Sequence, residues 1–206
     1  AELVIGLMLS LAREIPRADR EVRNGNWIKK ELMGTELRGK YLGIVGLGNI
    51  GKRLGRLAKA LNMNIIGFDV VPIDEEFTKE VGLMKTDLDT LLASSDYVSL
   101  HVPLLDSTKH LINSEKMDTM KNTARIINTS RGGVIDEDAL YEFLKDGKLG
   151  GAALDVFEVE PATSNNLASL PNFISTPHMG AQTKEAQLLA ANVIAEKIIQ
   201  VLRGVL

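Results

Sequence analysis

The sequence predicts an α/β fold in which a doubly wound parallel sheet carries helices on both faces and follows a long N-terminal helix. Three observations predict this fold class. Short apolar runs typical of buried strands alternate with stretches of helical periodicity. A glycine-rich turn directly follows the first of these runs, at 46–51. The 206 residues, 45% of them hydrophobic, suffice for one large domain with a substantial core.

The N-terminal 23 residues are predicted to form one long helix. Its first half, Leu3–Ala12, is apolar on nearly every side, which indicates burial against its own domain, with a second subunit as a further partner. A membrane span is not expected, because such a helix needs ~20 apolar residues. Pro16 should kink the helix and 24–26 should end it. Trp27, the only tryptophan, is expected in a pocket or an interface.

Strands and helices are then expected to alternate to the end of the chain. The expected strands are 41–45, 65–68, a weak edge strand near 82–84, 97–102, 124–128, 150–156 and 173–175. The expected helices are 50–61, 75–81, 87–93, 115–120, 137–145 and about 182–203, with capping residues at Thr86 or Asp87, Asn113 or Ser114, and Asp136. Ligands of such sheets bind beyond the carboxyl ends of the strands, so the residues just after each strand are the candidate site.

The turn after the first strand has the spacing of a dinucleotide-binding loop. Gly46, Gly48 and Gly51 stand at the G-x-G-x-x-G positions, with Asn49 and Ile50 opening the helix whose unpaired N–H groups would hold a pyrophosphate. The second strand ends at Asp69, eighteen residues past Gly51. A carboxylate there accepts hydrogen bonds from the adenosine ribose and repels a 2′-phosphate. The sequence therefore predicts a Rossmann-type site that prefers NAD over NADP.

Composition argues against several other classes of function. The net charge is −3 with no long basic cluster, so no nucleic-acid partner is expected. The chain has no cysteine, which excludes disulfides and thiolate chemistry, and its three histidines are far apart, so no metal site is expected. No signal-peptide pattern opens the chain, and we expect a cytoplasmic protein without a membrane partner.

Three further strand ends carry polar side chains that packing does not require. Arg131 lies in a glycine-flanked turn, where a guanidinium can fork onto a carboxylate. The stretch 155–160 supplies carboxylates, and His178 supplies an imidazole at a helix entrance. Together they make a proton donor, its supporting anion and an anion clamp.

These motifs resemble those of the D-2-hydroxyacid dehydrogenase family along nearly the whole chain. The matching segments are 43–51, Arg131-Gly132, 153–157 and 176–178. The stretches 25–27 and 180–187 look most like the D-3-phosphoglycerate dehydrogenase branch, which would imply oxidation of 3-phosphoglycerate in serine synthesis. The implied partner is a small 2-hydroxy or 2-keto acid, and the implied cofactor is NAD.

The resemblance also implies a role for each site residue. Arg131 would hold the substrate's carboxylate and carbonyl, His178 would pass the proton, and Glu160, directly before a proline, would hold His178 in its protonated form. Asp155 would meet the nicotinamide carboxamide, although a plain turn at a strand end is the alternative. Glu158 is expected to be solvated. The full cofactor-binding set is Gly46, Gly48, Asn49, Ile50, Gly51, Asp69, Val102, Pro103, Thr129, Ser130, Arg131, Asp155, His178, Gly180 and Ala181.

The expected domain organisation is a single dinucleotide-binding domain, 1–206, whose helical arm, 1–26, contributes to a homodimer. In this family the substrate domain is built from sequence on both sides of the nucleotide domain, and we expect it to be absent here. The chain should therefore bind NAD and show little or no turnover. Alternatives are a glyoxylate or hydroxypyruvate reductase and an NADH-sensing corepressor. A methyltransferase would also have the glycine-rich turn, but it gives no reason for Arg131, Glu160 and His178.

Overall fold

The computed structural model describes residues 1–163 and 165–202, in which seven parallel strands form one sheet. The strand order is β3-β2-β1-β4-β5-β6-β7. The strands are β1 (Tyr41–Val45), β2 (Asn64–Phe68), β3 (Met84–Lys85), β4 (Tyr97–Leu100), β5 (Arg125–Asn128), β6 (Gly151–Leu154) and β7 (Phe173–Ser175). The order reverses between β1 and β4, which is the point where open α/β sheets bind ligands, at the carboxyl ends of their strands. The predicted fold class is confirmed.

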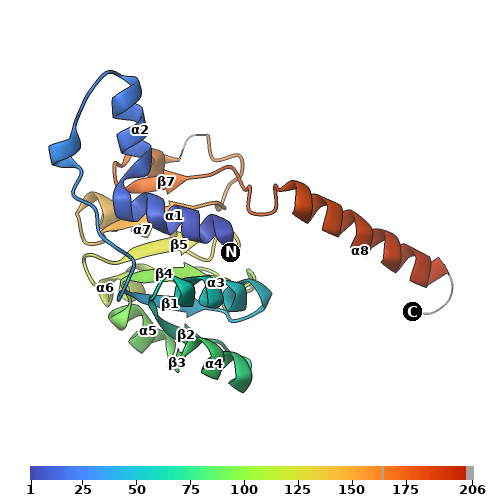
Figure 1. Cartoon of the computed structure of the whole chain (residues 1–206). Helices are drawn as coiled ribbons and strands as arrows, with labels where there is room; N and C mark the ends of the chain where they lie inside the picture. The colour runs from blue at the N-terminus through green and yellow to red at the C-terminus, as the bar shows by residue number, and fades with distance from the viewer. Residues whose placement is uncertain (164, 203–206) are drawn as a thin grey trace.

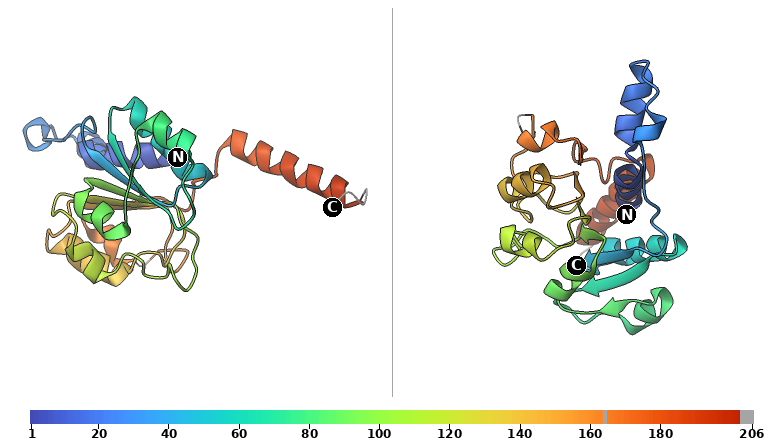
Figure 2. Two further views of the ribbon diagram at one scale, coloured as in Figure 1. Left: turned by 90° about the horizontal axis from the view of Figure 1, so that it is seen from below. Right: turned by 90° about the vertical axis from the view of Figure 1, so that its left-hand side faces the viewer.

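Helices cover both faces of the sheet (Figures 1 and 2). One core cluster packs α1 (Glu2–Arg13), α3 (Asn49–Ala60) and α4 (Glu75–Val81) against one face. The other packs α5 (Leu88–Ser94), α6 (Ser114–Asp118), α7 (Glu137–Lys145) and the short helix η2 (Asn166–Ser169) against the opposite face. Strand β4 shows how the pleat divides the two cores: Tyr97 joins the first cluster, whereas Val98 and Leu100 join the second.

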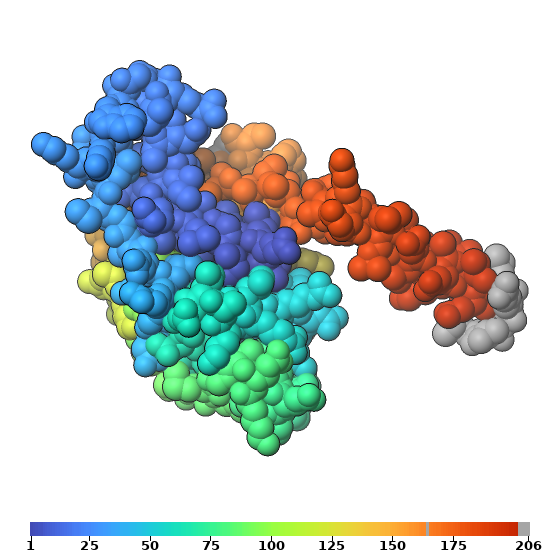
Figure 3. Space-filling view, in the orientation of Figure 1, coloured from blue at the N-terminus to red at the C-terminus, as the bar shows by residue number. Residues whose placement is uncertain are grey.

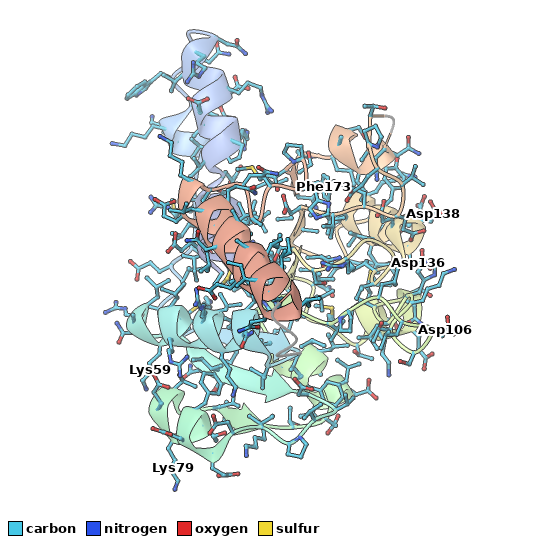
Figure 4. The ribbon with its side chains drawn as sticks, turned by 90° about the vertical axis from the view of Figure 1, so that its right-hand side faces the viewer. Lys59, Lys79, Asp106, Asp136, Asp138 and Phe173 are labelled. Carbon is cyan, nitrogen blue, oxygen red and sulfur yellow. The ribbon has the colours of Figure 1, made fainter. Side chains whose placement is uncertain are left out.

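In Figure 4 the two helical layers can be located by labelled charged residues. Lys59 of α3 and Lys79 of α4 lie on one side of the ribbon, and Asp136 and Asp138, at the start of α7, lie on the other. The caps are as expected from the sequence: Asp87, Asn113 and Asp136 each accept a hydrogen bond from a backbone N–H of the first turn. The short helices η1 (Lys29–Glu31) and η2 were not predicted.

The N-terminal segment is two helices, so the predicted single helix kinked at Pro16 is wrong. The first helix ends at Glu14, which adopts a left-handed conformation (φ 50°) and donates its N–H to the carbonyl of Ser10. The second helix, α2 (Ile15–Arg23), begins beyond this break. Pro16 lies in its first turn, where the missing N–H of proline costs no hydrogen bond.

Trp27 is not docked in a pocket of the described chain, because 81% of it is exposed. The strand predicted at 97–102 ends at Leu100, although the N–H of His101 still donates to Val45 (2.8 Å). The strand predicted at 150–156 is likewise shorter than expected. The shorter strands leave more residues in the loops that form the candidate site.

The last described helix, α8 (Lys184–Leu202), projects away from the body of the domain (Figures 1 and 3). Its predicted end at Arg203 lies outside the described residues. The helix exposes large apolar side chains, including Leu188 (65%) and Ile194 (59%). None of the described helices is both long and apolar enough to cross a bilayer.

Candidate active site

The three glycines of the turn after β1 each meet a different spatial demand. Gly46 has a positive φ of 94°, and a Cβ there would lie 2.7 Å from the carbonyl oxygen of His101. A Cβ on Gly51 would overlap the carbonyl oxygen of Gly46, so α3 can approach the strand only with glycine at this position. A Cβ on Gly48 would meet nothing within 4 Å. The space over Gly48 is therefore open to a ligand.

The start of α3 is built to receive an anion. Its N-cap is Gly48, which has no side chain to accept hydrogen bonds from the N–H groups of the first turn. That turn is formed by Asn49, Ile50 and Gly51. The N–H groups and the positive end of the helix dipole therefore face the open space over the turn. Such a site binds a phosphate without a basic side chain. These residues fit the pyrophosphate of a dinucleotide.

Asp69 directly follows β2, at its carboxyl end, and lies beside this turn, as predicted. One of its carboxylate oxygens accepts a hydrogen bond from Leu47 N (2.6 Å), and the other accepts one from Val71 N (3.0 Å). These bonds fix the carboxylate next to the glycine turn. A carboxylate oxygen accepts more than one hydrogen bond, so both oxygens keep capacity for ribose hydroxyls.

The loop that carries Arg131 packs directly against the loop after β6. A Cβ on Gly132 would overlap the backbone carbonyl of Phe157. Asn128, 1% exposed, shapes the turn from within: its amide donates to Arg131 O (2.9 Å) and its oxygen accepts from the N–H and hydroxyl of Ser130. The sequence reasoning missed Asn128; a polar residue ending a buried strand was the available signal.

The guanidinium of Arg131 is exposed and donates to the carbonyl of Ser130 (2.6 Å). No hydrogen bond within the described part of the chain joins Arg131 to Glu160 or His178. The structure places the three predicted catalytic residues at the same edge of the sheet, after β5, β6 and β7. It brings only Glu160 and His178 into direct contact.

Glu160 and His178 are joined by a direct hydrogen bond. His178 Nδ1 lies 2.8 Å from one carboxylate oxygen of Glu160, and the other oxygen accepts from Phe157 N (3.1 Å). The bond to His178 lowers the pKa of Glu160 below its usual value of 4.5. Beside the pair lies a cavity of about 550 Å³ whose lining includes Phe157 and Thr176. The second ring nitrogen, Nε2, remains available for a proton transfer.

Asp155 anchors the turn that carries His178. Its carboxylate is 1% exposed and accepts hydrogen bonds from the hydroxyl of Thr176 (2.6 Å), from Met179 N (2.9 Å) and from Gly180 N (2.9 Å). His178 itself has a positive φ of 53°. The three bonds supply the support that such a conformation needs in a residue other than glycine.

Glu158 is exposed, as we predicted, but its carboxylate also has partners within the protein. Its side-chain oxygen lies 3.0 Å from Nε2 of His110 and accepts a longer bond from Glu137 N (3.4 Å). No local sequence pattern signals these contacts, because they join segments 48 and 21 residues apart. Glu158 therefore belongs to a second polar network, with His110 and Glu137, that does not include His178.

The remaining predicted cofactor residues lie in the loops at the carboxyl edge of the sheet. Val102 and Pro103 follow β4, Thr129 and Ser130 follow β5, and Gly180 and Ala181 follow β7. His101 donates to or accepts from the hydroxyl of Ser99 (2.9 Å) beside the glycine turn.

Comparison with known proteins identifies the family of this chain's relatives. Residues 5–180 match the family model described as the NAD binding domain of D-isomer specific 2-hydroxyacid dehydrogenase. The chain is 49% identical over 205 residues to D-3-phosphoglycerate dehydrogenase of Methanocaldococcus jannaschii, covering 99% of this chain and 39% of that protein. It is 48% identical to hydroxypyruvate reductase of Thermotoga maritima, covering 97% of this chain and 65% of that protein.

A solved structure of similar fold is D-lactate dehydrogenase from Aquifex aeolicus complexed with NAD and lactic acid. The TM-score is 0.91 at 34% identity, covering 98% of this chain and 66% of that one. The chain thus spans about two fifths to two thirds of the length of these relatives.

Substitution of two glycines should separate folding from cofactor binding. Gly51→Ala should destabilise the fold by ~1–3 kcal/mol, because its Cβ overlaps the carbonyl of Gly46. Gly48→Ala should change stability by less than ~0.5 kcal/mol, since its Cβ meets open space. Its methyl group should nevertheless weaken NAD binding by about tenfold or more, by keeping the pyrophosphate from the backbone. Urea unfolding measures the change in stability, and calorimetry with NAD measures the change in affinity. An unchanged affinity in Gly48→Ala would contradict the placement of the pyrophosphate over Gly48.

The stability of the fold should depend on pH through His101. Burial lowers the pKa of its imidazole from 6.5 to about 4, whereas the unfolded chain keeps the ordinary value. Between these two values the unfolded chain takes up a proton that the folded chain does not. The free energy of unfolding should therefore fall as the pH drops from 6.5 toward 4. Urea unfolding at pH 7 and at pH 5 measures this loss.

The control for this pH effect is His101→Asn, whose amide can keep the hydrogen bond to Ser99 without titrating. The variant should lose less stability than the wild type between pH 7 and pH 5. Carboxyls with lowered pKa, such as Glu80 beside Arg56, lose their contribution only below their usual value of 4.5, outside this window. Equal losses in both proteins would assign the effect to other groups.

Proposed function

The chain belongs to the D-isomer specific 2-hydroxyacid dehydrogenase family, of which it is the NAD-binding domain, and from this premise we propose that it carries the cofactor site and the proton donor of an oxidoreductase. The enzyme would interconvert 2-hydroxy acids and 2-keto acids. The observation that carries the proposal is the contact of His178 with Glu160 (2.8 Å) at the same sheet edge as the glycine turn.

The cofactor assignment gives each part of the crevice a role. The turn from Gly46 to Gly51 and the first N–H groups of α3 hold the pyrophosphate, and Asp69 accepts hydrogen bonds from the ribose hydroxyls. Val102, Pro103, Thr129 and Ser130 would line the path of the cofactor toward His178, and Asp155, which holds the His178 turn, would meet the nicotinamide carboxamide. Bound NAD supplies the hydride acceptor, or in the reverse direction the hydride donor.

His178 and Glu160 handle the proton that accompanies hydride transfer. In the oxidation direction the substrate hydroxyl gives its proton to Nε2 of His178 as the C–O bond becomes a carbonyl. Glu160 accepts the hydrogen bond of Nδ1–H, which fixes the tautomer of the ring and balances the charge of the imidazolium. In the reduction direction Nε2 returns the proton to the carbonyl oxygen.

Arg131 acts as the clamp for the substrate's carboxylate. Its guanidinium is exposed and donates to a backbone carbonyl, that of Ser130, so a carboxylate can replace this acceptor without the loss of a buried contact. A guanidinium binds a carboxylate through two parallel hydrogen bonds, which orients the adjacent carbonyl toward His178.

We propose 3-phosphoglycerate as the hydroxy acid, in serine synthesis, with hydroxypyruvate or glyoxylate as the alternative. The first is supported by 49% identity to the phosphoglycerate enzyme, and the alternative by 48% identity to hydroxypyruvate reductase. The rest of the substrate pocket would come from a domain encoded outside these 206 residues. The exposed apolar side chains of α8, such as Leu188 and Ile194, are then the contact surface for that domain.

Turnover tests this function in a protein that carries these residues together with a substrate domain. Reduction of 3-phosphohydroxypyruvate should exceed reduction of hydroxypyruvate and glyoxylate. His178→Asn should lower kcat by about 10²-fold or more, since it removes the proton donor while asparagine tolerates the positive φ. The control is Lys79→Gln, an exposed residue of α4, which should leave kcat unchanged. Full activity of His178→Asn would contradict the assignment, and a preference for glyoxylate would select the alternative substrate.

We also propose that two copies pair through the N-terminal arm, 1–26, and the adjoining nucleotide domain. The second helix of the arm, α2, stands out from the body of the domain (Figure 3) and exposes Ile15 (48%) and Val22 (55%), and Trp27 (81%) lies just beyond the arm. Aromatic side chains of this kind are typical anchors of an interface. A twofold dimer is also the commonest assembly.

Sedimentation equilibrium tests the dimer. The wild type should have the mass of two chains at micromolar concentration, and Trp27→Glu should raise the dissociation constant by about tenfold or more. Thermal unfolding of the variant should match that of the wild type, because Trp27 is not part of the core. A wild-type monomer at these concentrations would contradict the proposal.

A further inference from the structure

We propose that Glu137, the first residue of α7, is a positioning residue that clamps the loop of Glu160 and so fixes its carboxylate against His178, a role that rests on the function proposed above for this pair. Glu137 touches neither His178 nor Glu160 in a hydrogen bond of the described structure. It would act through the backbone before Glu160 and through the side chain of Asn165 after it.

The loop that bears Glu160 has little packing of its own. Residues 158–161 are exposed, Val159 to 75%, and 155–163 contain no helix or strand. Yet the geometry of the pair is specific, with one oxygen of Glu160 on Phe157 N and the other on His178 Nδ1. A loop without buried side chains at its tip needs polar contacts from outside to hold such a geometry.

Glu137 provides those contacts on both sides of the loop tip. One of its carboxylate oxygens accepts a hydrogen bond from Glu158 N (2.6 Å), two residues before Glu160. The other accepts one from the side-chain amide of Asn165 (2.7 Å), five residues after Glu160. The amide of Asn165 cannot turn over freely, because its own oxygen caps Leu167 N (2.9 Å). Both oxygens of Glu137 are thus committed to the loop.

The clamp is braced by a return contact. The side chain of Glu158 accepts bonds from His110 Nε2 (3.0 Å) and, more weakly, from Glu137 N (3.4 Å). Glu137 is half-buried, and burial raises its pKa above the usual value of 4.5, with the charge of Glu158 adding to this effect. Burying a carboxylate beside another one costs free energy of folding, and the hydrogen bonds that Glu137 accepts offset this cost.

The same short stretch connects the clamp to the substrate arginine. Only five residues separate Arg131 from Glu137, and Gly132 among them packs against the carbonyl of Phe157. Figure 4 shows Asp136 and Asp138, the neighbours of Glu137, at the start of α7 on the side of the sheet that faces away from α3 and α4. The stretch therefore sets the position of the Glu160 loop relative to Arg131 as well as to His178.

A simpler role for Glu137 would be to stabilise the helix. An acidic side chain in a first turn favours the helix dipole, but the cap of α7 is already formed by Asp136, which accepts from Ala139 N (3.0 Å). A helix-stabilising role affects the free energy of unfolding alone. A positioning role also changes the electrostatics of Glu160.

The test reads the ionisation of Glu160 directly, by carbon NMR titration of its side-chain carboxyl in this chain. In the wild type its pKa should lie below the usual 4.5 because of His178. Glu137→Gln replaces one acceptor by an amide donor, which would face either Glu158 N–H or the Asn165 amide. We expect the loop to relax and the pKa of Glu160 to rise toward its usual value, as it should in His178→Asn.

Two further variants make the test specific. Glu142→Gln, on the same helix and exposed, is the matched control and should leave Glu160 unchanged. Glu137→Gln combined with Asn165→Asp reverses one hydrogen bond, since the introduced glutamine can donate to the new carboxylate while still accepting from Glu158 N. The double variant should return the pKa of Glu160 toward the wild-type value. If Glu137→Gln does not fold, Asn165→Ala, which deletes the donor to Glu137 together with the cap on Leu167 N, should raise this pKa in the same direction.

The outcomes separate this inference from the proposed function. If His178→Asn moves the pKa of Glu160 but Glu137→Gln does not, the pair stands and the clamp is wrong. A double variant as perturbed as Glu137→Gln would also contradict the clamp. If His178→Asn leaves the pKa of Glu160 unchanged, the ion pair itself fails, and the proposed function fails with it.

Discussion

Close backbone contact at the carboxyl edge of the parallel sheet is the constraint on which the rest of the structure depends. Gly46 approaches the carbonyl of His101 just after β1 and β4 end, and Gly132 approaches the carbonyl of Phe157 just after β5 and β6 end. Each contact leaves no room for a side chain. The loops that follow the strands are therefore pressed together, and polar groups from distant parts of the sequence meet there.

Two buried or half-buried carboxylates turn this proximity into a defined site. Asp155 takes three hydrogen bonds from the turn that carries His178, and Glu137 takes two from the loop that carries Glu160. The bond between Glu160 and His178 joins the two loops. In contrast, the guanidinium of Arg131 is exposed and donates to the carbonyl of Ser130, an acceptor that a substrate carboxylate can replace.

The sequence predicted what depends on local patterns and missed what depends on long-range contacts. The glycine turn, Asp69 and the alternation of strands and helices follow from short motifs and periodicity. His178 stood out as an imidazole after a predicted strand, and the resemblance selected Glu160 as its partner. The exposure of Glu158 was expected, but its contact with His110 was not, because that partner lies 48 residues away. The helix break at Glu14 was missed because a proline nearby offered a more obvious cause. Asn128 carries no motif, although it shapes the turn of Arg131.

The most direct measurement is thermal unfolding of this chain with saturating NAD and, separately, with NADP. Everything proposed to hold the cofactor is present in these residues. A ligand at a hundred times its dissociation constant stabilises the fold by ~2.7 kcal/mol, so NAD should raise the Tm by several degrees. NADP should do so much less, because Asp69 stands where a 2′-phosphate would lie. No rise with NAD, or equal rises with both, would contradict the account.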